Sequence, residues 1–426
     1  MAIETTILLG LWGAICGVWF GLLIAQAKAR RDGLILKASP RVHEQRVHDQ
    51  RMQDRNTPTV CVVIAARNES EGMASCLRNV LSQDYPELSV LVVDDRSEDA
   101  TYEIAKGFAR SDPRVRVKRI KDLPPGWMGK SHALWRGTRG LDTDWLLFTD
   151  VDCTLKPQAV STAIEEARNR NVQFLSLWPG QAAGGFWEHA VIPLCGGIIA
   201  LWFGSRRVNN PDCALAFANG QFLLIEREAY ERIGGHEAVR SSMIEDILLA
   251  DHAKRSGVAC WVAGGRDLVS VRMYDNYDEI LNGWARIYVG ALRSATKMAL
   301  SILWLLVGSL LPYVAAVWLV IAFSSAYAGG SKVGLELVFF AGMCVNHLSL
   351  MMIASYRFWG MGGCRRVDLL WYPLSVCVVI RILARSWWWL TIKRVVPWRN
   401  TCYRIDGRAR IVGSSTVNLR RSNPQR

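Results

Sequence analysis

Long uncharged runs of hydrophobic residues lie toward both ends of the chain and flank a middle part of mixed polarity. Residues 7–27, 300–327 and 333–354 are nearly free of charge, whereas residues 28–180 have the mixed pattern of a soluble domain. Each run is long enough for a helix that crosses a hydrocarbon core of roughly 30 Å, which takes about 20 residues. We therefore expect a soluble domain held by membrane-spanning helices on both sides.

The first run is expected to remain on the protein as an anchor, because no basic region precedes it and no small-residue cleavage site follows it. Basic residues follow it directly, and the positive-inside rule places that end of the helix in the cytoplasm. We expect a multi-pass protein of the cell (inner) membrane with its soluble domain in the cytoplasm. The expected segments are an anchor (1–30), a basic linker (31–57), the soluble domain (58–295), a membrane region (296–392) and a basic cytoplasmic tail (393–426).

The last apolar stretch, Leu369–Ile392, carries Arg381 and Arg385. An arginine at the centre of a membrane helix costs about 2.5 to 3.5 kcal/mol, so a full crossing is expensive. A re-entrant or surface-lying helix is our prediction for this stretch, and a crossing is the alternative. The membrane region then has two spans plus this helix.

Within the soluble part, short apolar runs alternate with amphipathic helical patterns. Strand-like runs cover Val60–Ala65, Leu88–Val93, Val115–Ile120 and Trp145–Thr149. Because these runs are apolar throughout and helical patterns separate them, they indicate a mainly parallel sheet with helices on both faces, which is an α/β fold.

Charged residues follow three of the predicted strands. They are Arg67-Asn68-Glu69, Asp94-Asp95 and Asp150-Val151-Asp152. Ligands of such sheets bind at the carboxyl ends of the strands, so these residues are candidates for one site. For each group taken alone, a turn or a helix cap is the ordinary explanation.

Asp150 and Asp152 stand two residues apart after an extended run, so both carboxylates can face one cation. Their oxygens suit Mg²⁺ or Mn²⁺, which would complete its shell with water and phosphate oxygens. Such a cation would neutralise a departing diphosphate.

The net charge of +13 calls for an anionic partner. The basic excess lies beside the apolar runs, where anionic lipid rewards each Lys or Arg by about 1 kcal/mol, so a membrane surface is the favoured partner. An anionic substrate and, for the last dozen residues, a merely solubilising tail are the alternatives. No segment resembles a nucleic-acid-binding module, and we expect no nucleic-acid partner.

A series of motifs resembles family 2 of the glycosyltransferases from about Val60 to Arg286. In order they read VVIAARNES, VLVVDDRSED, GWMGKSHALWRG, LLFTDVDC and MIEDILLADHAKRSG. The resemblance implies a nucleotide-sugar-binding, GT-A-like fold and inverting transfer of a hexose. Within the family the sequence looks like bacterial membrane enzymes that glycosylate lipids, including ceramide glucosyltransferases and carotenoid- and hopanoid-associated enzymes.

The resemblance also implies roles on the donor side. One of Asp94 and Asp95 would contact the uracil or ribose, and Lys130 would lie near the donor phosphates unless it is only a surface lysine. The remaining residues expected around the nucleoside are Ala65, through its backbone, Arg67 and Glu69.

Inversion in one displacement needs a base that takes the proton of the acceptor hydroxyl. Asp246 is the candidate, because Glu245-Asp246 opens a helical stretch after Gly234-Gly235, as the base motif of the family does. Glu245 would orient the acceptor or the backbone. Simple stabilisation of a helix N-terminus by two acids is the alternative explanation.

At 283–287 many membrane members carry Q-x-x-R-W, but this chain reads Gly283-Trp284-Ala285-Arg286-Ile287. Arg286 alone is retained and can meet phosphate oxygens in a bidentate way. The loss of the other two residues disfavours polymer synthesis and favours addition of one sugar to a lipid.

Two segments are candidates for the acceptor side. Residues 186–205 are apolar and interrupted by Pro193, and predict either a segment in the membrane interface or a buried helix. Asn219-Gly220-Gln221 resembles the lipid-glycosylating members, which would place Asn219 and Gln221 near the acceptor, although a turn before a strand would explain it too.

The leading hypothesis is therefore a glycosyltransferase with a nucleotide-sugar donor and a membrane-lipid acceptor. A polysaccharide synthase that also translocates its product is the second hypothesis. A non-catalytic nucleotide-sugar-binding membrane protein is the third.

Overall fold

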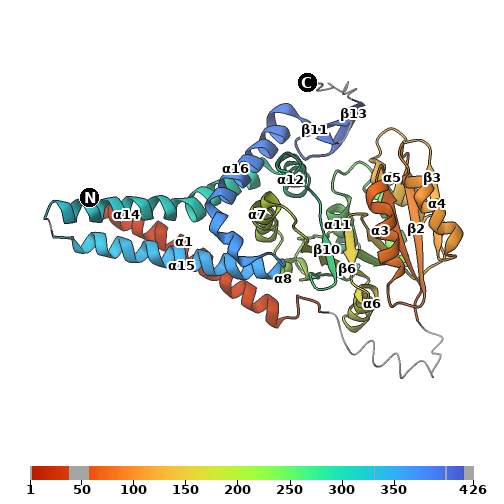
Figure 1. The fold of residues 1–426 in the computed structure, drawn as a ribbon, viewed down its shortest axis with the longest axis horizontal. Coiled ribbons are helices and arrows are strands. Elements are labelled where there is room, and N and C mark those ends of the chain that lie inside the picture. Colours follow the sequence, from red (N-terminus) through yellow and green to blue (C-terminus); the bar gives the residue numbers. More distant parts are fainter. Residues whose placement is uncertain (1, 38–56, 331, 399–400, 417–426) are drawn as a thin grey trace.

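The computed structural model describes residues 2–37, 57–330, 332–398 and 401–416. Most of the linker expected at 31–57 and the last ten residues of the tail lie outside these ranges. An α/β domain occupies one half of the molecule, and long helices extend from it (Figure 1).

A seven-stranded sheet forms the centre of the soluble domain, in the order β3-β2-β1-β4-β8-β6-β9. Only β8 runs antiparallel to its neighbours, so the prediction of a mainly parallel sheet is confirmed. The strands are β1 (Val60–Ala66), β2 (Leu88–Asp95), β3 (Val115–Ile120), β4 (Trp145–Thr149), β6 (Phe174–Trp178), β8 (Leu223–Glu226) and β9 (Cys260–Gly264).

Helices cover both faces of this sheet, because its strands are apolar on both sides. One core lies between the sheet and the first group of helices, and a second core lies between the sheet and the second group. The first group is α3 (Ser70–Leu81), α4 (Thr101–Ser111) and α6 (Ala159–Asn169); the second is α5 (Gly129–Thr138), α9 (Arg227–Arg232), α10 (Gly235–Ala238) and α11 (Glu245–Arg255). Smaller elements are α8 (Ser205–Val208) and a sheet of β5 (Cys153–Leu155), β10 (Val269–Val271) and β7 (Gly180–Gln181).

A third layer of helices joins the soluble domain to the extended helices. It consists of α7 (Phe186–Trp202), α12 (Tyr277–Leu292), α13 (Ala295–Trp304) and α16 (Tyr372–Trp388), which pack on one another. Val191 and Cys195 of α7 have no exposed surface, so the structure selects the buried alternative for the middle of this helix.

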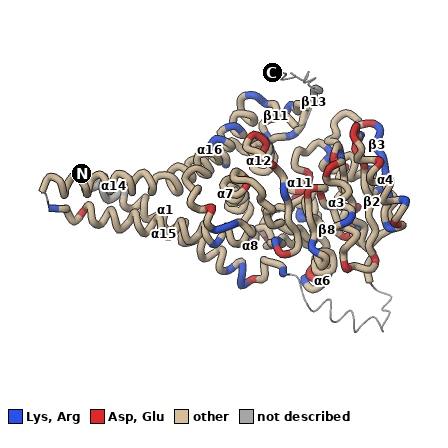
Figure 2. The backbone as a smooth tube through the Cα atoms, viewed as in Figure 1, with Lys and Arg blue, Asp and Glu red and all other residues tan. Residues whose placement is uncertain are grey.

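The extended helices are α1 (Ala2–Arg31), α14 (Leu311–Ala328) and α15 (Leu335–Met361). Figure 2 shows them almost without charge between their ends. In the described part of the chain, four helical segments are long and apolar enough to cross a membrane: Leu9–Arg31, Ala295–Ala328, Leu335–Met361 and Arg366–Lys393. The segments predicted to span a membrane, 7–27, 300–327 and 333–354, thus lie mostly in helices.

The segment with Arg381 and Arg385 is α16, half of which is buried inside the protein. Both guanidinium groups find partners on α12: Arg381 donates to the Tyr277 hydroxyl at 3.2 Å, and Arg385 donates to Asn282 Oδ1 at 2.7 Å. These hydrogen bonds lower the cost of keeping the arginines on an apolar helix. An interfacial position for this helix stays a prediction.

The described part of segment 393–426, which is expected to be only a basic tail, contains three strands. Beyond a left-handed Arg394 (φ 54°), β11 (Val395–Trp398), β12 (Thr401–Ile405) and β13 (Ile411–Thr416) form an antiparallel sheet beside α12 and α16 (Figure 1). The hydropathy pattern does not predict this sheet, because its strands are only four to six residues long and lack a regular alternation of polar and apolar residues.

Gly290 on α12 gives a test of this packing. A Cβ at this position would lie 2.0 Å from Cγ1 of Ile244, the residue before α11. Because overpacking a core costs about 1–3 kcal/mol, we expect Gly290→Ala to lower the melting temperature of the purified protein.

Gly107→Ala is the matched control, since Gly107 lies inside α4 with no atom within 4 Å of the added Cβ. Alanine is favoured over glycine in a helix by about 1 kcal/mol, so this variant should melt at the same or a higher temperature. Equal melting of both variants would contradict the packing described.

Candidate active site

The register of the sheet brings the charged strand ends to one edge. Ala66 of β1 lies beside Asp94 of β2, and Ile64 of β1 lies beside Thr149 of β4. Strand order reverses between β1 and β4, which is where ligands bind in open α/β sheets. A cavity of about 1130 Å³ opens at this point.

All but one of the predicted site residues line this cavity. They are Ala65, Arg67, Glu69, Asp95, Lys130, Asp150, Asp152, Asn219, Gln221, Glu245, Asp246 and Arg286. The remaining residue, Asp94, has no exposed surface and lies 3.2 Å from Arg119 Nε of β3. Neighbouring residues of a strand point to opposite faces, so Asp95 is the one that can meet a ligand.

Asp95 is positioned by contacts on two sides. Arg96 Nε lies 2.8 Å from Asp95 Oδ1, and Gly129 at the start of α5 leaves room for the other oxygen. A Cβ at Gly129 would lie 2.3 Å from Asp95 Oδ2, so any larger residue would displace the carboxylate.

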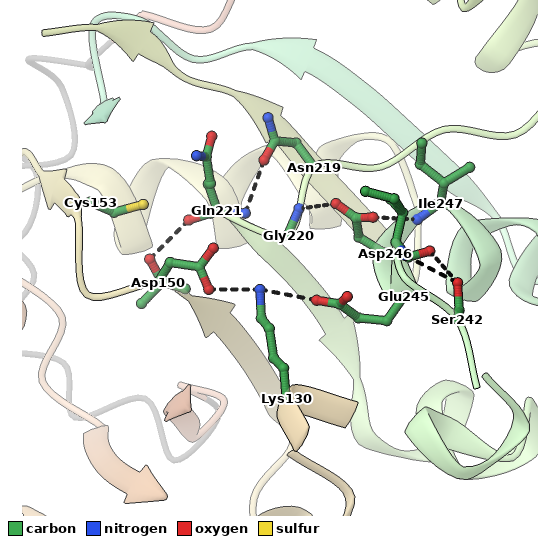
Figure 3. A network of polar contacts seen from close by, with 12 residues as sticks. Lys130, Asp150, Cys153, Asn219, Gly220, Gln221, Ser242, Glu245, Asp246 and Ile247 are labelled. Atoms are coloured by element: carbon green, nitrogen blue, oxygen red, sulfur yellow. Dashed lines mark hydrogen bonds and ion pairs between the residues drawn. The ribbon is translucent and has the colours of Figure 1, made fainter. Parts of the chain in front are cut away.

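Lys130 lies between two acids that are far apart in sequence. Its Nζ is 2.7 Å from Asp150 Oδ1 and 3.0 Å from Glu245 Oε1 (Figure 3). Burial alone would lower the pKa of Lys130, but the charges of Asp150 and Glu245 outweigh it and hold that pKa well above its ordinary value. The ammonium group therefore stays charged. Lys130 lines the cavity and is not a lysine of the outer surface.

Asp150 and Asp152 fit a divalent cation as donor ligands. Asp152 is accessible from the cavity, yet the surrounding protein withdraws it from bulk water. This desolvation, and after it the charge of Asp150, raises the pKa of Asp152 to about 7. Within the described ranges no cluster of three or more His, Cys, Asp or Glu forms a metal site. Mg²⁺ bound to nucleotides commonly uses one or two carboxylates and phosphate oxygens, so two are sufficient.

Asp246 opens α11 on the other side of Lys130. Its Oδ2 accepts a hydrogen bond from the Gly220 amide at 2.6 Å, and its Oδ1 accepts one from the Ile247 amide at 2.7 Å. Burial, followed by the charge of Glu245, raises the pKa of Asp246 to about 7 despite these bonds and the nearby Lys130. A carboxyl with this pKa is suited to proton transfer at neutral pH.

The loop Asn219-Gly220-Gln221 connects the two groups of acids. The carbonyl oxygen of Gln221 accepts from Thr149 Oγ1 at 2.8 Å, next to Asp150, while the Gly220 amide holds Asp246 (Figure 3). Asn219 Oδ1 accepts from the Gln221 amide at 2.9 Å, which is a local turn. The turn explanation is thus confirmed for this loop, and contact with the acceptor stays a prediction.

The altered motif on α12 has a steric explanation. A Cβ at Gly283 would lie 2.2 Å from the Tyr274 ring, so Tyr274 occupies the place of a longer side chain. Arg286, one turn further, places its guanidinium 4.7 Å from the centre of the Trp398 ring. Arg286 and Tyr274 both line the cavity.

Besides the acids, the cavity has an apolar part of its lining, the apolar arm. Its walls come from the central sheet, α7, α12 and α15. The apolar residues in this arm are Trp178, Ile192, Ile199, Phe217, Trp284, Phe358 and Trp359.

Sequence reasoning missed the aromatic residues of this cavity, in particular Tyr274, Trp398 and Tyr403. A signal for the last two was present, because Trp398 and Tyr403 are the aromatic residues of the basic segment 393–426. Only the folding of the tail into β11 and β12 brings them to the cavity.

Residues 61–234 match the family model described as Glycosyl transferase family 2. The 4,4'-diaponeurosporenoate glycosyltransferase of Staphylococcus aureus (strain USA300) is 25% identical over 360 residues, which cover 82% of this chain and 90% of the relative.

Two solved structures show more distant similarity. A mannosyltransferase from Pyrobaculum calidifontis, in complex with GDP-Man and Mn²⁺, is 15% identical with a TM-score of 0.45 and covers 88% of this chain and 99% of its own. Glucosyl-3-phosphoglycerate synthase from Mycobacterium tuberculosis is 20% identical with a TM-score of 0.36 and covers 55% of this chain and 80% of its own.

Lys130 gives a test of the arrangement that does not depend on activity. We expect Lys130→Met to lower the melting temperature, because Asp150 and Glu245 then lose the cation between them. Adding Glu245→Gln should restore part of the loss, with a coupling energy of about 0.5–3 kcal/mol in the double-mutant cycle. Lys121→Met, at an exposed lysine, should melt like the wild type. Strict additivity of the two site substitutions would show that this ion pair contributes nothing.

Proposed function

We propose that this chain, a glycosyltransferase with a family 2 domain, transfers a hexose from a UDP-sugar to a membrane lipid with inversion at the anomeric carbon. The observation that carries the proposal is the lining of the cavity. It combines Asp95, Asp150 and Asp152 at the strand ends with the apolar arm, whose residues come partly from α7, α12 and α15. A polar donor and an apolar acceptor fit these two kinds of lining.

The donor is placed with its nucleoside near Arg67 and Asp95 and its diphosphate near Asp150, Asp152 and Lys130. Mg²⁺ or Mn²⁺, held by Asp150 and Asp152, would neutralise the negative charge that develops on the leaving diphosphate. Lys130, which stays protonated, adds a fixed positive charge at the same end.

The acceptor is placed with its apolar part in the arm and its reacting oxygen at Asp246. As the acceptor oxygen forms its bond to the anomeric carbon, the bond from that carbon to the diphosphate oxygen breaks, and the hydroxyl proton passes to Asp246. The products are the glycosylated lipid and UDP. Glu245, already paired with Lys130, orients the site and takes no proton in this scheme.

Two further observations support a lipid acceptor on the cytoplasmic side. The relative from Staphylococcus aureus is named as a 4,4'-diaponeurosporenoate glycosyltransferase, which agrees with a lipid-related acceptor. In addition, the basic residues Lys28, Arg30 and Arg31 end the first membrane-length helix at the side of the soluble domain. The altered motif at Gly283, filled by Tyr274, supports transfer of single sugars.

Asp246→Asn is the direct test of the proposed reaction. Membranes that contain the protein are incubated with labelled UDP-sugar, lipid extract and Mn²⁺, and the labelled lipid is measured. Because general-base catalysis contributes about 10²–10⁴-fold, we expect the rate to fall by that factor while UDP binding is retained.

Asp251→Asn on the same helix is the control, since Asp251 lies 3.0 Å from Arg255 and does not line the cavity. This variant should keep the wild-type rate. Unchanged lipid labelling by Asp246→Asn would refute the assigned role of Asp246. Absence of lipid labelling with every UDP-sugar in the wild type would refute the donor or the acceptor.

The pH dependence of kcat/KM gives a second test. Asp246 must be ionised to accept a proton, and its pKa of about 7 lies above the ordinary value for aspartate. We therefore expect kcat/KM to fall as the pH drops through 7, approaching tenfold per pH unit well below it. This limb should be absent from the residual activity of Asp246→Asn. An unchanged limb would assign the titration to another group.

A further inference from the structure

The C-terminal sheet of β11, β12 and β13 closes one side of the cavity. Pro397 and Trp398 of β11 and Thr401 and Tyr403 of β12 line the same cavity as Ala65, Arg67 and Asp95 at the ends of β1 and β2. Trp398 pairs with Thr401 across the two strands, and Val396 pairs with Tyr403. Residues separated by more than 300 positions in the sequence therefore line the same cavity.

This sheet is attached to the elements that carry the predicted catalytic base. Ser242 forms an antiparallel bridge with Arg410, and the Ile411 amide donates to the Ser241 carbonyl at 3.4 Å. Both contacts fall on the segment that leads into Glu245 and Asp246. The end of α12 adds a hydrogen bond from Arg293 Nε to the Arg408 carbonyl at 3.2 Å.

Apolar and polar contacts give the sheet a fixed position. Val396, Ile405 and Ala409 are buried in the core shared with α12 and α16. Asp406 accepts hydrogen bonds from the Arg408 and Arg410 amides at 2.8 Å each, which closes the turn between β12 and β13. The sheet is thus a packed part of the fold beside the cavity.

Tyr403 faces the nucleoside end of the proposed donor site. It lines the cavity together with Arg67 and Asp95 at the ends of β1 and β2. Burial raises the pKa of its hydroxyl, whereas a hydrogen bond with Thr401 and the charges of Arg67 and Arg96 lower it. Trp398, with its ring 6.2 Å from that of Tyr403, lies under the Arg286 guanidinium at 4.7 Å. Tyr403 thus lines the cavity, and Trp398 contacts an arginine of the same cavity.

We propose that the C-terminal sheet is a wall of the donor site, in which the Tyr403 ring stacks on the nucleobase and Trp398 positions Arg286 toward the diphosphate. The inference rests on the proposed function, because it needs a nucleotide-sugar donor in the cavity. Base stacking on an aromatic ring tolerates loss of the hydroxyl but not of the ring. An arginine on a tryptophan face keeps its donors directed at phosphate oxygens.

The test is binding of UDP and of uridine, each with Mg²⁺, to the full-length protein in detergent by titration calorimetry. Tyr403→Ala should weaken both ligands by about tenfold, as expected for loss of one stacking contact, and Tyr403→Phe should bind both like the wild type. Trp398→Leu should weaken UDP but leave uridine unchanged, since uridine lacks the diphosphate. Val412→Ala is the control, because Val412 is 65% exposed in the same sheet and does not line the cavity.

Amide hydrogen exchange of the wild type covers the case in which a substitution disturbs folding. Bound UDP should slow exchange in residues 395–398 and 401–405, and unchanged exchange there would overturn the inference. So would wild-type UDP affinity in a folded Tyr403→Ala protein, or a change in acceptor KM alone. Failure of the wild type to bind UDP would refute the proposed donor and this inference together, whereas the other outcomes leave the proposed function standing.

Discussion

The ammonium group of Lys130 is the interaction on which the arrangement of the site depends. It lies within 3.0 Å of both Asp150, from the end of β4, and Glu245, from the start of α11. Without a cation between them, carboxylates gathered at one sheet edge would repel one another in surroundings partly removed from water. Lys130 offsets part of this negative charge. The pKa of Asp152 and that of Asp246 are raised first by burial and then by the neighbouring carboxylates of Asp150 and Glu245, respectively.

The remaining negative charge affects Asp152 and Asp246 differently. At Asp152, the divalent cation of the proposed function would offset the repulsion from Asp150. At Asp246 the raised pKa keeps a carboxyl ready to exchange a proton near neutral pH. Backbone hydrogen bonds of the Asn219-Gly220-Gln221 loop connect it to Thr149 at the end of β4 and to Asp246 at the start of α11.

One layer of packed helices connects the α/β domain to the membrane-length helices. Helices α7, α12 and α16 form a core that touches the soluble domain on one side and the membrane-length helices on the other. The apolar arm of the cavity runs through this layer, past Ile192 and Trp284. Apolar residues of this layer and the charged residues at the sheet edge therefore line one cavity.

The amino-acid sequence by itself determined the local elements and most of the chemistry. Apolar runs specified the strands and membrane-length helices because burial depends on composition and length, and the acids after β1, β2 and β4 were placed at one edge because parallel strands share their carboxyl ends. Tertiary structure alone decided which of Asp94 and Asp95 faces the cavity. Adjacent strand residues point to opposite faces, and Asp94 pairs with Arg119 of the neighbouring strand β3. It also decided that Tyr274 fills the place beside Gly283 and that β11 and β12 bring Trp398 and Tyr403 to the cavity. Such contacts join residues far apart in the chain, and a local pattern of hydrophobic and polar positions carries no information about their partners.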